Sequence, residues 1–122
     1  MANTINWFEI PAKDFDRACK FYGTLFDADL HKQDMGEAKM GFFPYDGNGV
    51  SGAVCAVKDF EPSTNGVMVY LNGGENLQGM LDKVAPAGGK VVVEKTLITP
   101  EIGYFAIFMD TEGNKVAMHS PK

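Results

Sequence analysis

A short pattern occurs twice in this chain, 66 residues apart. Residues 47–50 (GNGV) in the first half correspond to residues 113–116 (GNKV) in the second. The second copy lies in the predicted turn of a hairpin over residues 104–119, whose first arm is rich in the aromatic and branched residues typical of strands. Residues 40–54 follow the same plan. A repeat of this kind indicates a duplicated chain, and it constrains the fold more than any other feature.

The first half predicts one helix among several strands. We expect a strand over residues 4–10 and a helix that begins after the N-cap Asp14 and ends near residue 26. Apolar residues three and four positions apart mark the buried side of this helix. Further strands are expected over residues 30–36, 39–44 and 50–57. Residues 58–66 (KDFEPSTNG) are typical of a linker.

The second half repeats this order. A strand over residues 67–72 precedes an amphipathic helix that starts near Leu77 and ends near residue 85, before Pro86 and two glycines. A strand over residues 90–94, a loop over 97–103 and the hairpin complete the chain. The order β-α-β-β-β, twice, predicts an α+β fold of module 1 (about 1–58), a linker (about 59–66) and module 2 (about 67–122).

Composition narrows the classes of function. At 122 residues the chain is expected to form a single domain. A net charge of −5 and a pI near 4.9 argue against nucleic acid as a partner. No apolar run approaches the roughly 20 residues of a membrane helix, so no membrane partner is expected. Two cysteines and the lack of a signal-peptide pattern favour a cytoplasmic location.

Three stretches together resemble a known family. FEIPAKDFDRACKFYGTLF, VYLNGGENLQGMLDKVAPAGGKVV and FMDTEGNKVAM, in this order, are similar to the vicinal-oxygen-chelate superfamily, which includes glyoxalase I, bleomycin-resistance proteins and extradiol dioxygenases. The resemblance implies that two βαβββ modules form a cup-shaped, mainly antiparallel sheet. It also implies a homodimer, in which modules are sometimes exchanged. The sequence leaves open whether one cup is built from one chain or from two.

Enzymes of this family place a divalent metal in the cup, held by residues of the first and last strands of each module. The matching positions here are Trp7, Ser51, about Met68, and Ala117. None is His, Glu or Asp, so we expect no metal and no other cofactor. Trp and Met are large and apolar, and at these positions they favour a filled or ligand-stacking cup over a metal site.

Polar residues two positions along the strands could still converge near Trp7. These are Glu9, Tyr70 and His119, and they suggest a hypothesis in which Glu9 or His119 acts as a general base. The plainer interpretations are that Glu9 pairs with backbone or a lysine, and that His119 lies near a frayed C-terminus. Phe105 is a further candidate for the pocket wall.

The sequence leaves three classes of function open and does not decide whether the chain is an enzyme. Our leading hypothesis is metal-independent binding of a small apolar or aromatic molecule, with Trp7, Ser51, Met68, Tyr70, Phe105 and Ala117 as ligand-binding residues. The alternative is a lyase, isomerase or dioxygenase-like enzyme, with Zn, Ni, Fe or Mn in a displaced site or acid–base chemistry at Glu9, Tyr70 and His119. A third class is an accessory domain whose cup is closed. Residues 99–104 form either a lid or an ordinary connection.

Overall fold

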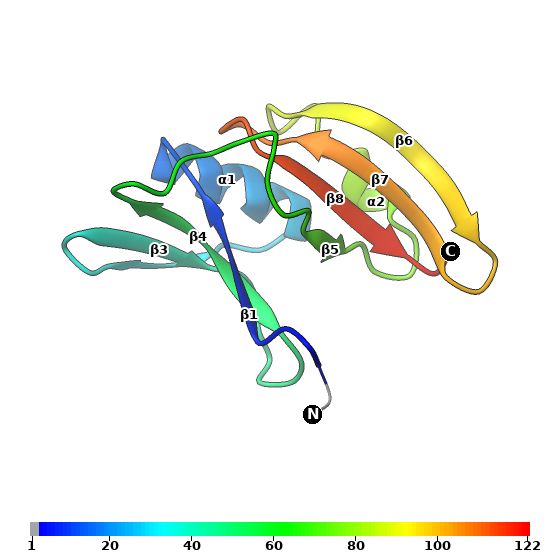
Figure 1. The fold of residues 1–122 in the computed structure, drawn as a ribbon, viewed down its shortest axis with the longest axis horizontal. Helices are drawn as coiled ribbons and strands as arrows, with labels where there is room; N and C mark the ends of the chain where they lie inside the picture. Colours follow the sequence, from blue (N-terminus) through cyan, green and yellow to red (C-terminus); the bar gives the residue numbers. More distant parts are fainter. Residues whose placement is uncertain (1–2) are drawn as a thin grey trace.

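Two four-stranded sheets, each associated with a helix, make up the computed structural model, which describes residues 3–122 (Figure 1). The elements in chain order are β1 (Trp7–Pro11), α1 (Phe15–Phe26), β2 (His31–Asp34), β3 (Ala38–Phe42), β4 (Ser51–Val57), β5 (Tyr70–Asn72), α2 (Gln78–Leu81), β6 (Lys90–Thr99), β7 (Gly103–Met109) and β8 (Lys115–Ser120). The N-terminal sheet has the order β1-β4-β3-β2, and the C-terminal sheet has the order β5-β8-β7-β6. The predicted α+β fold class of two βαβββ modules is confirmed. The exact module boundaries stay a prediction, and residues 1–2 of module 1 lie outside the described residues.

The duplication extends to the pairing of the strands. In each sheet the first strand pairs with the last in parallel, and the other pairs are antiparallel. Trp7 is opposite Ser51, and Tyr70 is opposite Ala117, which stands 66 residues after Ser51. The counterpart of Trp7 in module 2 is therefore Tyr70. The equivalence of Trp7 with Met68 that we inferred from the sequence is wrong, because Met68 precedes β5.

The first helix forms as the sequence predicts. The Asp14 side chain accepts a 3.1 Å hydrogen bond from the backbone N–H of Arg17, which satisfies one free donor of the first turn. The helix ends at Asp27, whose φ of 55° is left-handed. The second helix is only one turn, Gln78–Leu81, and continues as turns instead of reaching residue 85. Its N-cap Leu77 supplies no side-chain hydrogen bond, and Gly79 lowers its helix propensity.

Two strands of the C-terminal sheet differ in length from the prediction. β5 covers Tyr70–Asn72 rather than residues 67–72, and β6 continues to Thr99, into the predicted loop. β6 pairs with β7 through three register shifts, which let a long strand bend along its neighbour. The turn after β6 is therefore short, and it ends at Gly103, whose φ of +106° favours glycine.

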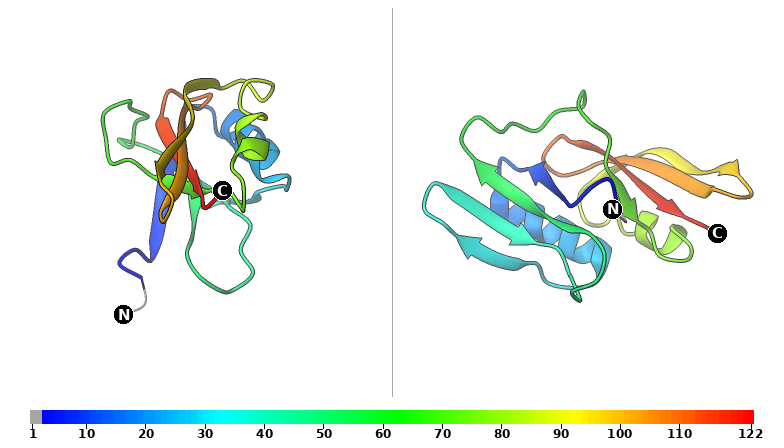
Figure 2. Two further views of the ribbon diagram at one scale, coloured as in Figure 1. Left: turned by 90° about the vertical axis from the view of Figure 1, so that its right-hand side faces the viewer. Right: turned by 60° about the horizontal axis from the view of Figure 1, so that its bottom comes forward.

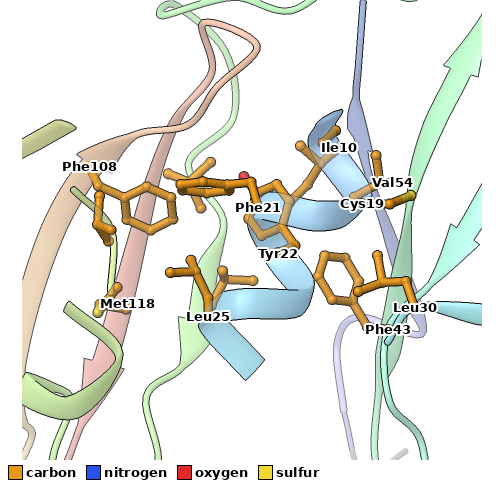
Figure 3. Close-up of a cluster of buried hydrophobic side chains, with 14 of the residues drawn as sticks. Ile10, Cys19, Phe21, Tyr22, Leu25, Leu30, Phe43, Val54, Phe108 and Met118 are labelled. Atoms are coloured by element: carbon orange, nitrogen blue, oxygen red, sulfur yellow. The ribbon is translucent and has the colours of Figure 1, made fainter. Parts of the chain in front are cut away.

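Helix α1 packs against both sheets. Phe21 and Phe108 have ring centroids 5.8 Å apart, and Tyr22 and Phe43 have centroids 5.5 Å apart. In Figure 3, Phe108 and Met118 approach α1 from one side, while side chains of the N-terminal module approach from the other. The left view of Figure 2 shows α1 and α2 on the same side of the strands. Both sheets thus turn one face toward the helices and the opposite face away from them.

Candidate functional site

The outer face of the N-terminal sheet is the face that points away from α1. A Cβ on Gly41 would lie 2.5 Å from the Cys19 Sγ of α1, so position 41 faces the helix. Side chains alternate along a strand, so Met40 and Phe42 point to the opposite face. Residues that pair across neighbouring strands lie on the same face, so the strand register identifies the other residues of the outer face. The outer face comprises Trp7, Glu9, Pro11, His31, Gln33, Ala38, Met40, Phe42, Ser51, Ala53, Cys55 and Val57.

Aromatic rings form an open corner on this face. Trp7 is 42% exposed, and its ring centroid lies 6.0 Å from that of Phe42, with 55° between the planes. Phe42 in turn stacks on His31 at 6.1 Å. The indole N–H of Trp7 donates a 3.3 Å hydrogen bond to Glu9 Oε2. Glu9 is therefore partnered by Trp7, and not by backbone or a lysine as the plainer interpretation held.

The residues beneath this corner are small and buried. Ser51, Ala53 and Cys55 of β4 are all buried, and the Cys55 thiol lies 3.1 Å from the Met40 sulfur. Burial, and then the charge of Glu9, raise the pKa of Cys55 to about 12. The thiol therefore stays protonated at neutral pH. Because the thiolate is the form that acts as a nucleophile or metal ligand, we expect neither role for Cys55.

The outer face of the C-terminal sheet carries the other predicted site residues. Tyr70 is 55% exposed, Ala117 is fully buried, and Phe105 pairs across the strands with His119. His119 Nε2 donates a 2.6 Å hydrogen bond to the carbonyl oxygen of Ile102. This bond ties the turn between β6 and β7 to β8, so His119 belongs to an ordered strand and not to a frayed end.

The predicted site residues thus form two groups. Trp7, Glu9 and Ser51 lie together on the N-terminal sheet, and Tyr70, Phe105, Ala117 and His119 lie on the C-terminal sheet. Met68 is half-buried and precedes β5. Since both sheets turn their helix faces to α1, the structure of one chain does not bring Glu9 to His119. Their roles as general bases stay predictions.

A cleft of about 380 Å³ lies where the two modules meet. It is bordered by β1, by the linker and by the start of β8. Its wall is mostly apolar and comprises Phe8, Ile10, Pro11, Phe60, Val67, Val69 and Val116, with Glu9, Glu61, Ser63, Gly66, Asn114 and Lys115. Glu9 is the one predicted site residue in this wall, so it stands between the cleft and the aromatic corner.

A buried polar network joins the modules beside this cleft. The Tyr22 hydroxyl donates a 2.7 Å hydrogen bond to Asp110 Oδ2, and Asn114 Nδ2 donates to the Pro11 carbonyl at 2.8 Å. Asp110 Oδ1 also accepts from the backbone N–H groups of Glu112 and Asn114. Burial first, and then the Asp110 charge, raise the pKa of Tyr22 well above its ordinary value.

Glu112 extends this network to the start of α1. Its side chain is fully buried and accepts from Arg17 Nε at 2.7 Å and from the backbone N–H groups of Lys13 and Asp14. Burial alone would raise the pKa of Glu112, but the Arg17 guanidinium and these donors lower it overall. This ion pair between Arg17 and Glu112 was not predicted from the sequence. The one available signal was that the chain has a single arginine.

The residues do not fit the divalent metal that the family's enzymes hold. With Tyr70 in place of Met68, the four family positions are Trp7, Ser51, Tyr70 and Ala117, which offer no imidazole or carboxylate. Across residues 3–122, no three His, Cys, Asp or Glu side chains gather closely enough to hold a metal ion. Within the same residues, no helix has the length and apolarity needed to cross a membrane.

Two βαβββ modules, each with a parallel pairing of its first and last strands, define a two-module α+β protein. The family model for the Glyoxalase/Bleomycin resistance protein/Dioxygenase superfamily matches residues 4–118, and the chain belongs to this family. A glyoxylase-like domain-containing protein of Didymella fabae is 32% identical in an alignment of 119 positions that covers 93% of this chain and 91% of that protein.

Solved structures share the fold at low identity. A glyoxalase I mutant from Zea mays has a TM-score of 0.67 and 17% identity, covering 95% of this chain and 45% of the maize chain. The present chain therefore spans about half the length of that enzyme. TnmS3, an antibiotic binding protein from Streptomyces sp. CB03234, has a TM-score of 0.66 and 22% identity, covering 100% of this chain and 99% of that chain.

Proposed function

We propose that this protein binds a small apolar or aromatic molecule without a metal ion. The observation that carries the proposal is Trp7, which occupies a family metal-ligand position and presents a 42% exposed ring beside Phe42. An open pair of tilted rings is suited to a flat ligand, because aromatic groups gain contact area and favourable ring–ring geometry there. TnmS3, similar in fold over the whole chain, is an antibiotic binding protein, which supports binding as a function of such a scaffold.

The second part of the proposal is that two copies form the binding cup together. In one chain α1 lies between the sheets, so the faces that carry Trp7 and Tyr70 turn away from each other. The accessible surface is 7431 Å², whereas a folded monomer of 13.3 kDa is expected to expose about 6,450 Å². A second copy would cover part of this excess and bring the outer face of a C-terminal sheet against that of an N-terminal sheet.

The free, buried thiols of Cys19 and Cys55 are suited to a reducing compartment, and we propose a cytoplasmic location on this basis.

Binding can be tested with Trp7 as the reporter, since it is the one Trp of the chain. The probe is N-phenyl-1-naphthylamine, a neutral aromatic dye that takes energy from an excited Trp. Titration should quench Trp7 emission and raise dye emission with a saturable curve. A dye that binds without quenching Trp7, or does not bind, would refute the proposal.

A pair of variants separates the aromatic corner from general surface binding. Trp7→Ala should weaken dye binding, followed by dye emission, by about tenfold, because loss of ring contact is worth about 1–2 kcal/mol. Met35→Ala is the control: Met35 is 55% exposed and lies in the turn between β2 and β3.

The proposal that binding needs no metal ion is tested by elemental analysis of the purified protein. One equivalent of tightly held Zn, Ni, Fe or Mn would contradict it.

A further inference from the structure

The outer face of the N-terminal sheet carries a single formal charge within its described strands, that of Glu9. The charged side chains of β2 and β3 point to the opposite face of the sheet, toward α1. Lys32 shows this directly, because its Nζ lies 3.0 Å from the carboxylate of Asp16 on α1. Lys39 is two positions before Gly41 in β3, so its side chain lies on the same face of the sheet as Gly41, the face toward α1. A ligand on the outer face therefore meets a carboxylate and no ammonium or guanidinium group of this sheet.

Glu9 is held in place beside the aromatic corner. Its Oε2 accepts the indole N–H of Trp7, and its carboxylate also interacts with the buried Cys55 thiol beneath it. Because the N–H of Trp7 is occupied by Glu9, what Trp7 offers a ligand is its ring surface. Phe42 adds a second ring, tilted by 55°. The corner thus combines two π surfaces with one exposed carboxylate.

We propose that the preferred ligand of this face is an organic cation, an aromatic or apolar molecule that carries a protonated amine. This inference depends on the proposed function and specifies the chemical class of its ligand. Ring faces attract cations electrostatically, and a carboxylate accepts a short, charge-assisted hydrogen bond from an ammonium group. The net charge of −5 favours the approach of cations as well.

Anionic ligands lack a partner on this face. Carboxylate and phosphate groups are bound most strongly by the forked guanidinium of arginine. The chain has one arginine, Arg17, and both of its contacts with Glu112 are made at the junction of the modules. A carboxylate placed at the corner would meet the like charge of Glu9 instead.

Three probes that share one ring system test the inference. They are 2-naphthylmethylamine, which is protonated at pH 7, the neutral 2-naphthylmethanol, and the anion 2-naphthoate. Binding is followed by the ¹⁵N–¹H resonance of the Trp7 indole, which is unique because the chain has one Trp. The amine should bind about tenfold more tightly than the alcohol, and the anion least tightly.

Variants assign the preference to Glu9. In Glu9→Gln the advantage of the amine should fall to about twofold or less, while the affinity for the alcohol is retained. Glu37→Gln removes one negative charge from the turn between β2 and β3 and should keep the full preference. Equal binding of amine and alcohol by the unmodified protein would refute the cation inference and leave the proposed function standing. If no probe moves the Trp7 resonance, both fail, and a preference that persists in Glu9→Gln refutes the role of Glu9.

Discussion

Tyr22 and Asp110 are 88 residues apart in the chain, yet the Tyr22 hydroxyl donates a 2.7 Å hydrogen bond to the Asp110 carboxylate. Both side chains are buried, and they come from different modules. The bond joins the helix of module 1 to the hairpin turn of module 2. It therefore helps to fix how the two sheets sit on α1, and with them the directions of their outer faces.

Removal of this hydroxyl should destabilise the protein. In Tyr22→Phe the Asp110 carboxylate keeps its bonds to Asn114 and to backbone but loses one buried donor, and we expect a loss of about 2 kcal/mol. Urea unfolding measures this as a lower midpoint at an unchanged slope. Tyr45→Phe is the control, because its exposed hydroxyl makes only a 3.3 Å bond to Gly49. Equal effects of the two changes would contradict the role of Tyr22.

The same bond predicts a loss of stability at alkaline pH. The pKa of Tyr22 is raised in the folded state, first by burial and then by Asp110, above the value near 10 of an exposed tyrosine. A raised pKa means that the stabilisation is complete below pH 10 and is lost as the pH rises further. The difference in unfolding free energy between the natural protein and Tyr22→Phe should therefore shrink above pH 10. A constant difference up to pH 11 would contradict this.

Glu112 predicts the opposite dependence, at acidic pH. Burial raises its pKa, but the hydrogen bond from Arg17 and the donors at the start of α1 lower it overall, below the ordinary value of 4.5. The stabilisation is therefore complete above pH 4.5 and is lost as the pH falls through the lowered pKa. Glu112→Gln should cost roughly 1–2 kcal/mol at pH 7 and progressively less below pH 4.5. Urea midpoints of both proteins between pH 3 and pH 7 test this, and a cost that stays constant over this range would contradict it.

Much of the fold could be predicted because local signals and the global architecture agree. Asp14 caps α1 as expected, and Gly113 has the positive φ, +97°, that the predicted hairpin turn requires. The short second helix was not predictable from periodicity, because the apolar pattern is compatible with a longer helix, whereas Gly79 and the lack of a side-chain N-cap bond favour a short one.

The site was harder to predict than the fold. Period-two counting placed Trp7 and Glu9 on one face, and the structure joins them by a hydrogen bond. The same counting could not show that the Tyr70 face lies on the far side of α1, since that depends on how two sheets share one helix. The Arg17–Glu112 ion pair was not predicted either, because its two residues are 95 positions apart in the sequence.

The close approach of β3 to α1 gives a further prediction. In Gly41→Ala the new Cβ would lie 2.5 Å from Cys19 Sγ, with the Leu30 side chain also in contact, so we expect a loss of about 1–3 kcal/mol from overpacking. Cys19→Ala removes the sulfur, and in the double variant part of this loss should be recovered. Gly79→Ala is the control, as no atom lies within 4 Å of its Cβ position. Thermal or urea unfolding of the four variants tests the geometry, and additive losses in the double variant would contradict it.

The exposed position of Tyr70 makes the proposed pairing of two chains testable. If the outer face of the C-terminal sheet packs on a second copy, light scattering after gel filtration should give a mass of about twice 13.3 kDa. Tyr70 is 55% exposed in one chain, so Tyr70→Glu should leave the fold intact. In the pair it would bury an unmatched charge, and the dimer should weaken at least tenfold. Met35→Glu, at a similarly exposed position in the N-terminal module, should leave the mass unchanged. A monomeric natural protein, or a dimer that tolerates Tyr70→Glu, would show that the two chains do not meet at this face.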